Sequence, residues 1–164
     1  MDIRILGPEN WEKYKQLRLQ GLRQDPRAFG KAYEEEVDFT EEEWKGRLSG
    51  HKTIYGAEAD GKLVGMAGVL FTDKKYFQHM ATIVGVYVDP AHRGQGIGKS
   101  LVQRLLDDLR RNPKITKVRL SVNTTQDAAI KMYEQIGFVQ AGLAKHEMKI
   151  GEEYTDQLQM ELIF

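Results

Sequence analysis

The chain of 164 residues contains no cysteine. Without thiols it can form no disulfide, no thiolate metal site and no acyl-cysteine intermediate, so any group transfer must proceed without a thiol nucleophile. No apolar run approaches the length of a membrane span, and the first residues, Met1 to Ile5, have the pattern of a strand rather than of a signal peptide. We therefore expect a cytoplasmic protein with no membrane partner.

The chain also lacks an excess of charge of either sign, since 24 lysines and arginines balance 24 aspartates and glutamates. This balance gives no reason to expect nucleic acid or an anionic membrane surface as a partner. The histidines lack metal-ligand spacing, so we expect no metal site; they are His51, His79, His92 and His146. With 41% hydrophobic residues the chain can bury one substantial core, which predicts a single domain over residues 1–164.

Hydrophobic periodicity and turn signals predict the order of elements. Strands are expected at 2–6, 53–59, 63–71, 78–88, 117–122, 138–148 and 153–163, and helices at 9–24, from 40, at 97–111 and at 127–136. Asp60-Gly61 predicts a hairpin, Thr124 and Asp127 a helix cap, and Gly137 a helix end. The strand–helix–strand order over residues 83–122 implies a parallel crossover. The predicted fold class is therefore α/β, with a single mixed, mostly antiparallel sheet flanked by helices on both faces.

The most informative segment is a glycine-rich loop between a strand and a helix. Gly94, Gly96 and Gly98 leave backbone N–H groups uncovered where the helix begins, an arrangement suited to a pyrophosphate. A dinucleotide fingerprint needs a glycine three residues after its second, and here the third follows after two. A P-loop needs four residues between its glycines, so Gly98-Lys99-Ser100 matches only its end. Both nucleotide motifs therefore fail on spacing.

Two segments instead resemble the GNAT superfamily of acyl-CoA N-acyltransferases. Residues 93–98 resemble the Arg/Gln-x-x-Gly-x-Gly/Ala loop of that family, and residues 86–88 resemble the strand that leads into it. Asn123 and residues 127–138 are similar to the second cofactor motif, a strand, a helix and a Gly-Phe turn. Many relatives have Asn where this chain has Gln126, so the cofactor contact there belongs to Gln126 or Asn123, or is lost.

The resemblance implies a bound acetyl-CoA and assigns its contacts. The backbone of Val86 and Val88, at a splayed gap beside the strand of residues 117–122, would pair with the pantetheine arm and polarise the thioester carbonyl. The full set of expected cofactor residues is Val86, Tyr87, Val88, Arg93, Gly94, Gln95, Gly96, Ile97, Gly98, Lys99, Ser100, Asn123, Gln126, Ala129 and Tyr133.

Family position makes Tyr133 the candidate general acid, because a phenol with a reference pKa of about 10 holds its proton until the thiolate leaves. On its helical pattern alone, Tyr133 is instead a core aromatic. The incoming ammonium needs a base, for which Glu34, Glu35 and Glu36 are candidates, although such a run is more often a solvated charged face. Tyr87 is a proton conduit, a wall of the acceptor site or a packing residue.

The leading hypothesis is an acetyl-CoA-dependent N-acetyltransferase in which a primary amine, on a small molecule or a peptide, attacks the thioester directly. The alternatives are another acyl-CoA donor and a non-catalytic acyl-CoA sensor on the same fold. A nucleotide-binding protein of another class would need an acidic ribose partner where Ser121, Val122 and Asn123 stand. The apolar residues of the last strands suit an extended sheet across a homodimer.

Overall fold

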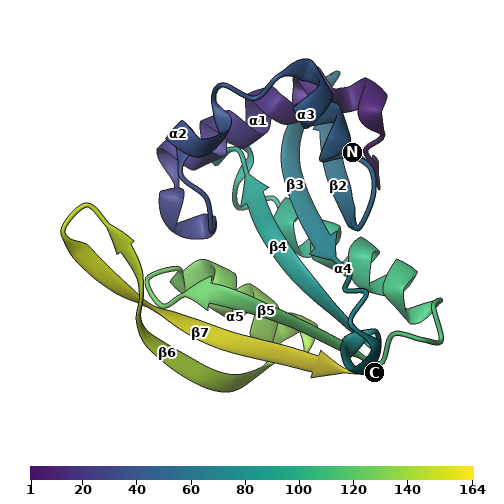
Figure 1. Cartoon of the computed structure of the whole chain (residues 1–164), viewed down its shortest axis with the longest axis vertical. Coiled ribbons are helices and arrows are strands. Elements are labelled where there is room, and N and C mark those ends of the chain that lie inside the picture. Colours follow the sequence, from purple (N-terminus) through teal and green to yellow (C-terminus); the bar gives the residue numbers. More distant parts are fainter.

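The computed structural model describes all residues 1–164 and contains one seven-stranded sheet with the order β1-β2-β3-β4-β5-β7-β6 (Figure 1). The strands are β1 (Asp2–Ile5), β2 (Lys52–Ala59), β3 (Lys62–Leu70), β4 (Met80–Val88), β5 (Lys117–Asn123), β6 (Val139–Ile150) and β7 (Glu153–Ile163). Only the β4–β5 pair is parallel, and all other neighbours are antiparallel. The predicted mixed, mostly antiparallel sheet is confirmed.

Helices cover both faces of this sheet. They are α1 (Trp11–Gln24), α2 (Tyr33–Glu36), α3 (Glu41–Gly46), α4 (Ile97–Arg110) and α5 (Asp127–Ile136), and a 3-10 turn, η2 (Pro26–Ala28), follows α1. Adjacent residues of β2 point to opposite faces: Ile54 packs into the core beneath α1 and α3, and Tyr55 into the core beneath α4 and α5. No helix has the length and apolar character needed to cross a membrane.

Strands β4 and β5 separate along their length, which shapes the rest of the molecule. Their pairing covers only Met80–Thr82 against Lys117–Arg119. Beyond that point β4 has an irregular register with β3, and Gly85 adopts φ +60 in this stretch. Because a bulge bends its strand and increases its twist, the end of β4 turns away from β5. Figure 1 shows the two strands diverging toward α1 and α2. The expected splay is therefore present.

The predictions of turns and helix caps were less reliable than the predicted order of strands and helices. The Asp60-Gly61 turn joins β2 to β3 with both residues at positive φ, and Gly137, at φ +115, ends α5, as predicted. The predicted cap of α5 by Thr124 and Asp127 is wrong, because Gln126 is the N-cap residue and makes no side-chain cap. The acidic stretch, for which no element was predicted, contains the short helix α2.

Candidate functional site

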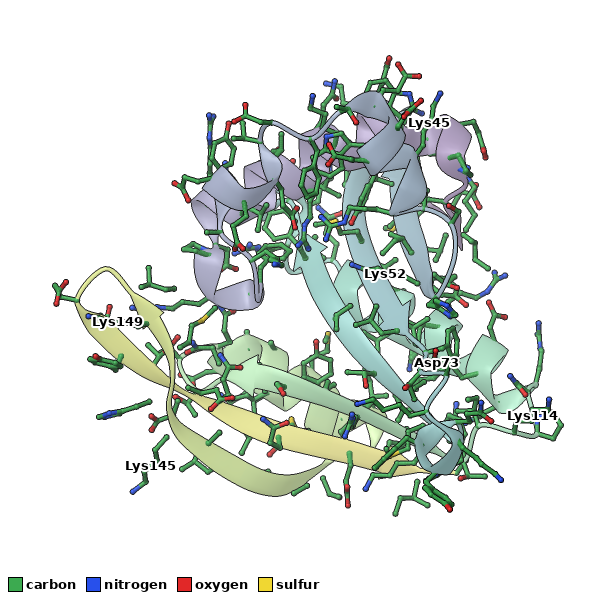
Figure 2. The ribbon with its side chains drawn as sticks, in the orientation of Figure 1. Lys45, Lys52, Asp73, Lys114, Lys145 and Lys149 are labelled. Carbon is green, nitrogen blue, oxygen red and sulfur yellow. The ribbon has the colours of Figure 1, made fainter.

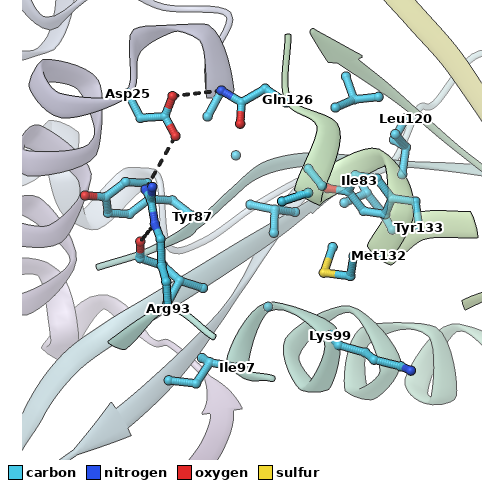
Figure 3. Close-up of a pocket in the computed structure, with 18 of the residues that line it drawn as sticks. Asp25, Ile83, Tyr87, Arg93, Ile97, Lys99, Leu120, Gln126, Met132 and Tyr133 are labelled. Atoms are coloured by element: carbon cyan, nitrogen blue, oxygen red, sulfur yellow. Dashed lines mark hydrogen bonds and ion pairs between the residues drawn. The ribbon is translucent and has the colours of Figure 1, made fainter. Parts of the chain in front are cut away.

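A cavity of about 440 Å³ lies where β4 and β5 separate (Figure 3). Its walls come from β4, β5, the loop before α4, the first turn of α4, one side of α5 and the segment after α1. Every expected cofactor residue lines it except Gln95 and Ser100, which are exposed outside it. Two sequence motifs about 30 residues apart therefore contribute to one cavity, and their part in binding remains a prediction.

The glycine loop forms an open cradle at the start of α4. Gly94 and Gly96 both have positive φ, +77 and +76, and an added Cβ at either would meet no atom within 4 Å. The first helical hydrogen bond runs from the N–H of Ser100 to the carbonyl of Gly96, and the N–H groups of residues 94–99 find no acceptor in the chain. Unpaired N–H groups at a helix N-terminus form a site for an anion such as a pyrophosphate.

The end of β4 presents backbone groups to the cavity. The N–H of Asp89 bonds to Val64 on β3, so by alternation the N–H and C=O of Val88 point to the other side, where β5 has moved away. The Val88 carbonyl accepts a hydrogen bond from Nε of Arg93 at 2.9 Å. The side chain of Arg93 thus lies across the end of β4, with its guanidinium 5.5 Å from the centroid of the Tyr87 ring.

The side chains of Asn123 and Gln126 form hydrogen bonds with different parts of the molecule. Asn123 is 1% exposed; its amide donates to Oγ1 of Thr155 at 2.7 Å, and its carbonyl accepts from the N–H and hydroxyl of Thr125. These bonds tie β5 to β7, and a contact of Asn123 with a cofactor stays a prediction. Gln126 lines the cavity, and its Nε2 donates to Asp25 at 2.8 Å.

Tyr133 reaches the cavity from α5. Its ring packs edge-on against Phe138, with centroids 5.7 Å apart, and Figure 3 shows the ring turned into the pocket between Met132 and Gln126. The residue is 5% exposed, and burial raises its pKa well above the ordinary value of a tyrosine. Tyr133 therefore belongs to the core and also lines the cavity, and its role as a general acid stays a prediction.

Tyr87 lies on the opposite face of β4 from Val86 and Val88, as the alternation of a strand predicts. It is buried beneath α1, its hydroxyl donates to Gln24 at 2.9 Å, and it borders the cavity. Burial is the largest influence on the pKa of Tyr87 and raises it. These contacts describe a packed wall between the cavity and α1.

The segment after α1 supplies lining residues that sequence reasoning missed: Asp25, Arg27 and Ala28. From the sequence, Asp25-Pro26 indicated only the end of a helix. No local pattern indicates that the end of α1 lies beside a cleft formed by residues about 100 positions later in the chain. Arg27 forms an ion pair with Glu153 at the start of β7, 2.5 Å apart. The remaining unexpected lining residues are Ile83, Val84, Gly85, His92, Leu120, Ser121, Val122, Ala128, Met132 and Gln135.

None of the three glutamates expected over the acceptor cleft lines the cavity. Glu35 accepts from the N–H of Ala32 and from Lys31, and Glu34 is exposed. Glu36 is 1% exposed and is held by Arg18 and Arg47. Burial acts to raise the pKa of Glu36, but the hydrogen bonds from the two arginines prevail and hold the pKa below its usual value. None of these three candidates for the base therefore lies in the cavity lining.

Lys52, on β2, lies beside this buried cluster (Figure 2). Burial, followed by the repulsion of Arg47 and Arg18, lowers the pKa of Lys52 to about 8. Figure 2 shows Lys52 against the sheet, whereas Lys45, Lys114 and Lys145 extend from the periphery. No group of three or more histidines, aspartates or glutamates is placed to hold a metal ion.

Comparisons with known proteins agree on one family. The Acetyltransferase (GNAT) family pattern matches residues 18–138. N-alpha-acetyltransferase RimI of Mycobacterium tuberculosis is 36% identical over 110 residues, 65% of this chain and 66% of that protein. L-methionine sulfoximine/L-methionine sulfone acetyltransferase of Salmonella typhimurium is 34% identical over 98 residues, 58% of this chain and 56% of that protein. The matches therefore span between about half and two thirds of these relatives.

Among solved structures, an acetyltransferase of the GNAT family from Streptococcus pneumoniae superposes with a TM-score of 0.88 at 20% identity, and the match covers 99% of each chain. This likeness supports the acyl-CoA N-acyltransferase fold. The protein belongs to the GNAT acetyltransferase family.

Proposed function

We propose that this protein is an acetyl-CoA-dependent N-acetyltransferase, in which a primary amine attacks the thioester without a covalent enzyme intermediate. The observation that carries the proposal is the run of unpaired N–H groups over residues 94–99 at the mouth of the cavity between β4 and β5. Membership of the GNAT family supports the same chemistry. The absence of cysteine agrees with direct attack.

Different parts of the cavity would bind the pyrophosphate and the pantetheine arm of acetyl-CoA. The loop before α4 would hold the pyrophosphate through backbone N–H groups, and the positive end of the helix dipole adds to this attraction. The free backbone edge of β4 at Val86 and Val88 would pair with the amide groups of the pantetheine arm. The Val88 carbonyl already accepts one hydrogen bond from Arg93, and its second lone pair is free to accept another from a ligand.

Tyr133 is the proposed general acid. When the C–S bond breaks, the leaving thiolate needs a proton, and a phenol whose pKa is raised by burial keeps its proton throughout the neutral range. The hydroxyl reaches a cavity whose lining is half hydrophobic, where charge on the leaving sulfur is poorly solvated. A proton donor at this position therefore lowers the barrier to collapse of the adduct.

The relatives suggest two classes of acceptor. RimI is named for transfer to an α-amine, and the Salmonella enzyme for transfer to amino-acid analogues. In both kinds of acceptor the primary amine is bonded to the α-carbon, which is attached to a carbonyl or carboxyl carbon. An α-amine has a reference pKa near 8, so about one molecule in ten is neutral at pH 7, compared with about one in 2,500 for a lysine side chain. We therefore propose an α-amine rather than a lysine as the acceptor.

The test begins with calorimetric titration of the chain with acetyl-CoA, followed by thiol release with three acceptors. These are a pentapeptide with an N-terminal alanine, L-methionine sulfone, and the same pentapeptide blocked at its N-terminus and carrying one lysine. Thiol release with either of the first two supports the proposal and identifies the acceptor class. Release with the lysine peptide alone contradicts the preference for an α-amine.

Two further outcomes contradict the proposal, one its catalytic activity and the other its acetyl donor. Binding of acetyl-CoA without release for any acceptor supports an acyl-CoA sensor instead. Tighter binding and faster release with a longer acyl-CoA, such as succinyl-CoA or propionyl-CoA, supports a different donor. Each acceptor is assayed with all three donors, so that the failure of one pair is not mistaken for a failure of the class.

A further inference from the structure

Asp25 is the only carboxylate among the residues that line the cavity. The other ionisable side chains of the lining carry positive charge or are neutral, and they include Arg27, Arg93 and Lys99. A group that attracts a protonated amine into this space must be negative. The position of the one carboxylate in the cavity therefore bears directly on how an amine acceptor is bound.

A backbone hydrogen bond fixes the position of Asp25, while its side chain does not cap the helical turn that follows. The residue follows the last turn of α1, and its N–H donates to the carbonyl of Gly21 at 2.8 Å. Asp25 stands at the N-cap of η2, where an aspartate usually accepts from a backbone N–H. No such hydrogen bond is made here. The carboxylate instead points across the cavity.

Its hydrogen bonds leave room for a ligand. Oδ1 accepts from Nε2 of Gln126 at 2.8 Å, and Oδ2 lies 3.5 Å from a guanidinium nitrogen of Arg93. An ionised carboxylate offers about four acceptor positions, so these two contacts do not use them all. The side chain is 22% exposed. Figure 3 shows Asp25 and Tyr133 on opposite sides of the pocket, with Gln126 between them.

We propose that Asp25 binds the ammonium group of the acceptor and accepts its proton before the amine attacks. This inference rests on the proposed N-acetyltransferase function. It replaces the acidic stretch of α2, which lies outside the cavity, as the source of the base.

The proton and electron balance is complete without a further reagent. The ammonium gives one proton to Asp25, and the nitrogen lone pair then forms the C–N bond to the thioester carbonyl. The C–S bond breaks with its electron pair on sulfur, which takes the proton of Tyr133. The Tyr133 phenolate regains a proton from the new amide nitrogen. The proton on Asp25 passes to solvent through its exposed side.

Proton transfer from an α-ammonium to an aspartate is uphill by about four pKa units in water. When an acceptor fills the cleft, water leaves, and desolvation favours the neutral pair over the ion pair. The charged and titratable groups around Asp25 are Arg93 from the loop after β4, Tyr87 on β4, and Arg27 on η2, which is itself paired with Glu153.

The test is the pH dependence of Asp25→Asn with the alanine pentapeptide as acceptor. In the wild type, kcat/KM for the peptide varies little between pH 6 and the pKa of its amine, about 8, because the bound ammonium is the substrate. In Asp25→Asn only the neutral amine reacts, so kcat/KM rises about tenfold per pH unit up to pH 8. The deficit is about 100-fold at pH 6 and falls to within about threefold at pH 9.

Two variants separate this role from a structural one. Glu34→Gln removes an exposed carboxylate outside the cavity and leaves the profile unchanged. Asp25→Glu keeps the charge and recovers part of the activity at pH 6. Calorimetry with acetyl-CoA accompanies each variant, and the dissociation constant of Asp25→Asn stays within about threefold of the wild type. Similar thermal melts confirm that the variants are folded.

The outcomes are distinguishable. An active wild type with an unchanged acceptor profile in Asp25→Asn overturns the role of Asp25 and leaves the proposed function intact. An equal loss of kcat/KM at every pH also overturns it, because a positioning defect is not relieved by neutralising the amine. A wild type that releases no thiol with any acceptor overturns both proposals.

Discussion

The ring of Tyr133 packs edge-on against Phe138, with centroids 5.7 Å apart, and the two residues flank the end of α5. This contact places the tyrosine hydroxyl without any hydrogen bond that would position it. The ring of Tyr133 therefore has a packing role, and the proposed chemical role belongs to the hydroxyl alone. The two can be separated by removing the oxygen alone.

Tyr133→Phe is expected to lower kcat by about 10² to 10⁴ while acetyl-CoA binding stays nearly unchanged, because a general acid is lost and the packing is kept. Thiol release and calorimetry measure the two effects. Tyr55→Phe is the matched control, since Tyr55 is also a buried tyrosine and does not line the cavity. Its hydroxyl donates to Asp108 on α4. Unchanged turnover in Tyr133→Phe removes the residue from the mechanism.

Gly96→Ala tests the cradle. Gly96 has φ +76, and a residue with a Cβ in this left-handed region loses about 1 kcal/mol of stability. Gly151, in the turn between β6 and β7, has φ +60 and equally open surroundings, so Gly151→Ala carries a similar strain far from the loop. Both variants are expected to unfold at lower denaturant concentrations. Only Gly96→Ala is expected to weaken acetyl-CoA binding, by about tenfold, because its methyl group crowds the unpaired N–H groups. Equal dissociation constants in the two variants contradict the cradle.

Motif reasoning found the part of the site that is contiguous in sequence. The loop of residues 93–98 and the helix that carries Tyr133 each combine a local pattern with a local geometry, and both line the cavity. Asp25 was missed because it meets Gln126 across 101 positions, through the packing of α1 on the sheet. The bond of Asn123 to Thr155 was not predicted either, because it depends on the pairing of β5 with β7, which no local pattern reveals.

The acidic stretch is a second case in which tertiary contacts could not be predicted from the sequence. Glu34, Glu35 and Glu36 are equivalent in sequence, yet only Glu36 faces inward from α2 and meets Arg18 and Arg47. The partners come from α1 and from the residue after α3, so their meeting is a tertiary event. Order of elements, sheet type and helix ends follow from local chemistry, whereas the pairing of buried charges does not.

Glu36→Gln is expected to destabilise the fold by about 3–5 kcal/mol, because the buried guanidinium of Arg18 and the half-buried one of Arg47 lose their counter-charge. The exposed Glu34→Gln is the control and is expected to have an effect below about 0.5 kcal/mol. Since the pKa of Glu36 is held below its usual value in the folded state, its contribution is present above the unfolded pKa of about 4.5. It is lost as the pH falls below that value, so urea melts of variant and wild type converge in acid. A constant difference down to pH 3 contradicts the ion-pair assignment.

Lys52→Met is expected to stabilise the protein at pH 7 by about 2 kcal/mol, because the apolar stem is kept and a disfavoured charge is removed. The sign follows from the pKa of about 8, which lies below the unfolded value, so the folded state binds the Lys52 proton less tightly than the unfolded chain. The penalty on the wild type is complete below pH 8 and is relieved as the pH rises from 8 toward about 10.4. Urea melts at pH 7 and pH 10 therefore give a large difference between variant and wild type at the lower pH and a small one at the higher pH. Lys145→Met, at an exposed strand position, is expected to show no such pH dependence. A Lys52→Met gain that is equal at both pH values assigns the effect to packing and contradicts a penalty on the Lys52 charge from burial and from the repulsion of Arg47 and Arg18.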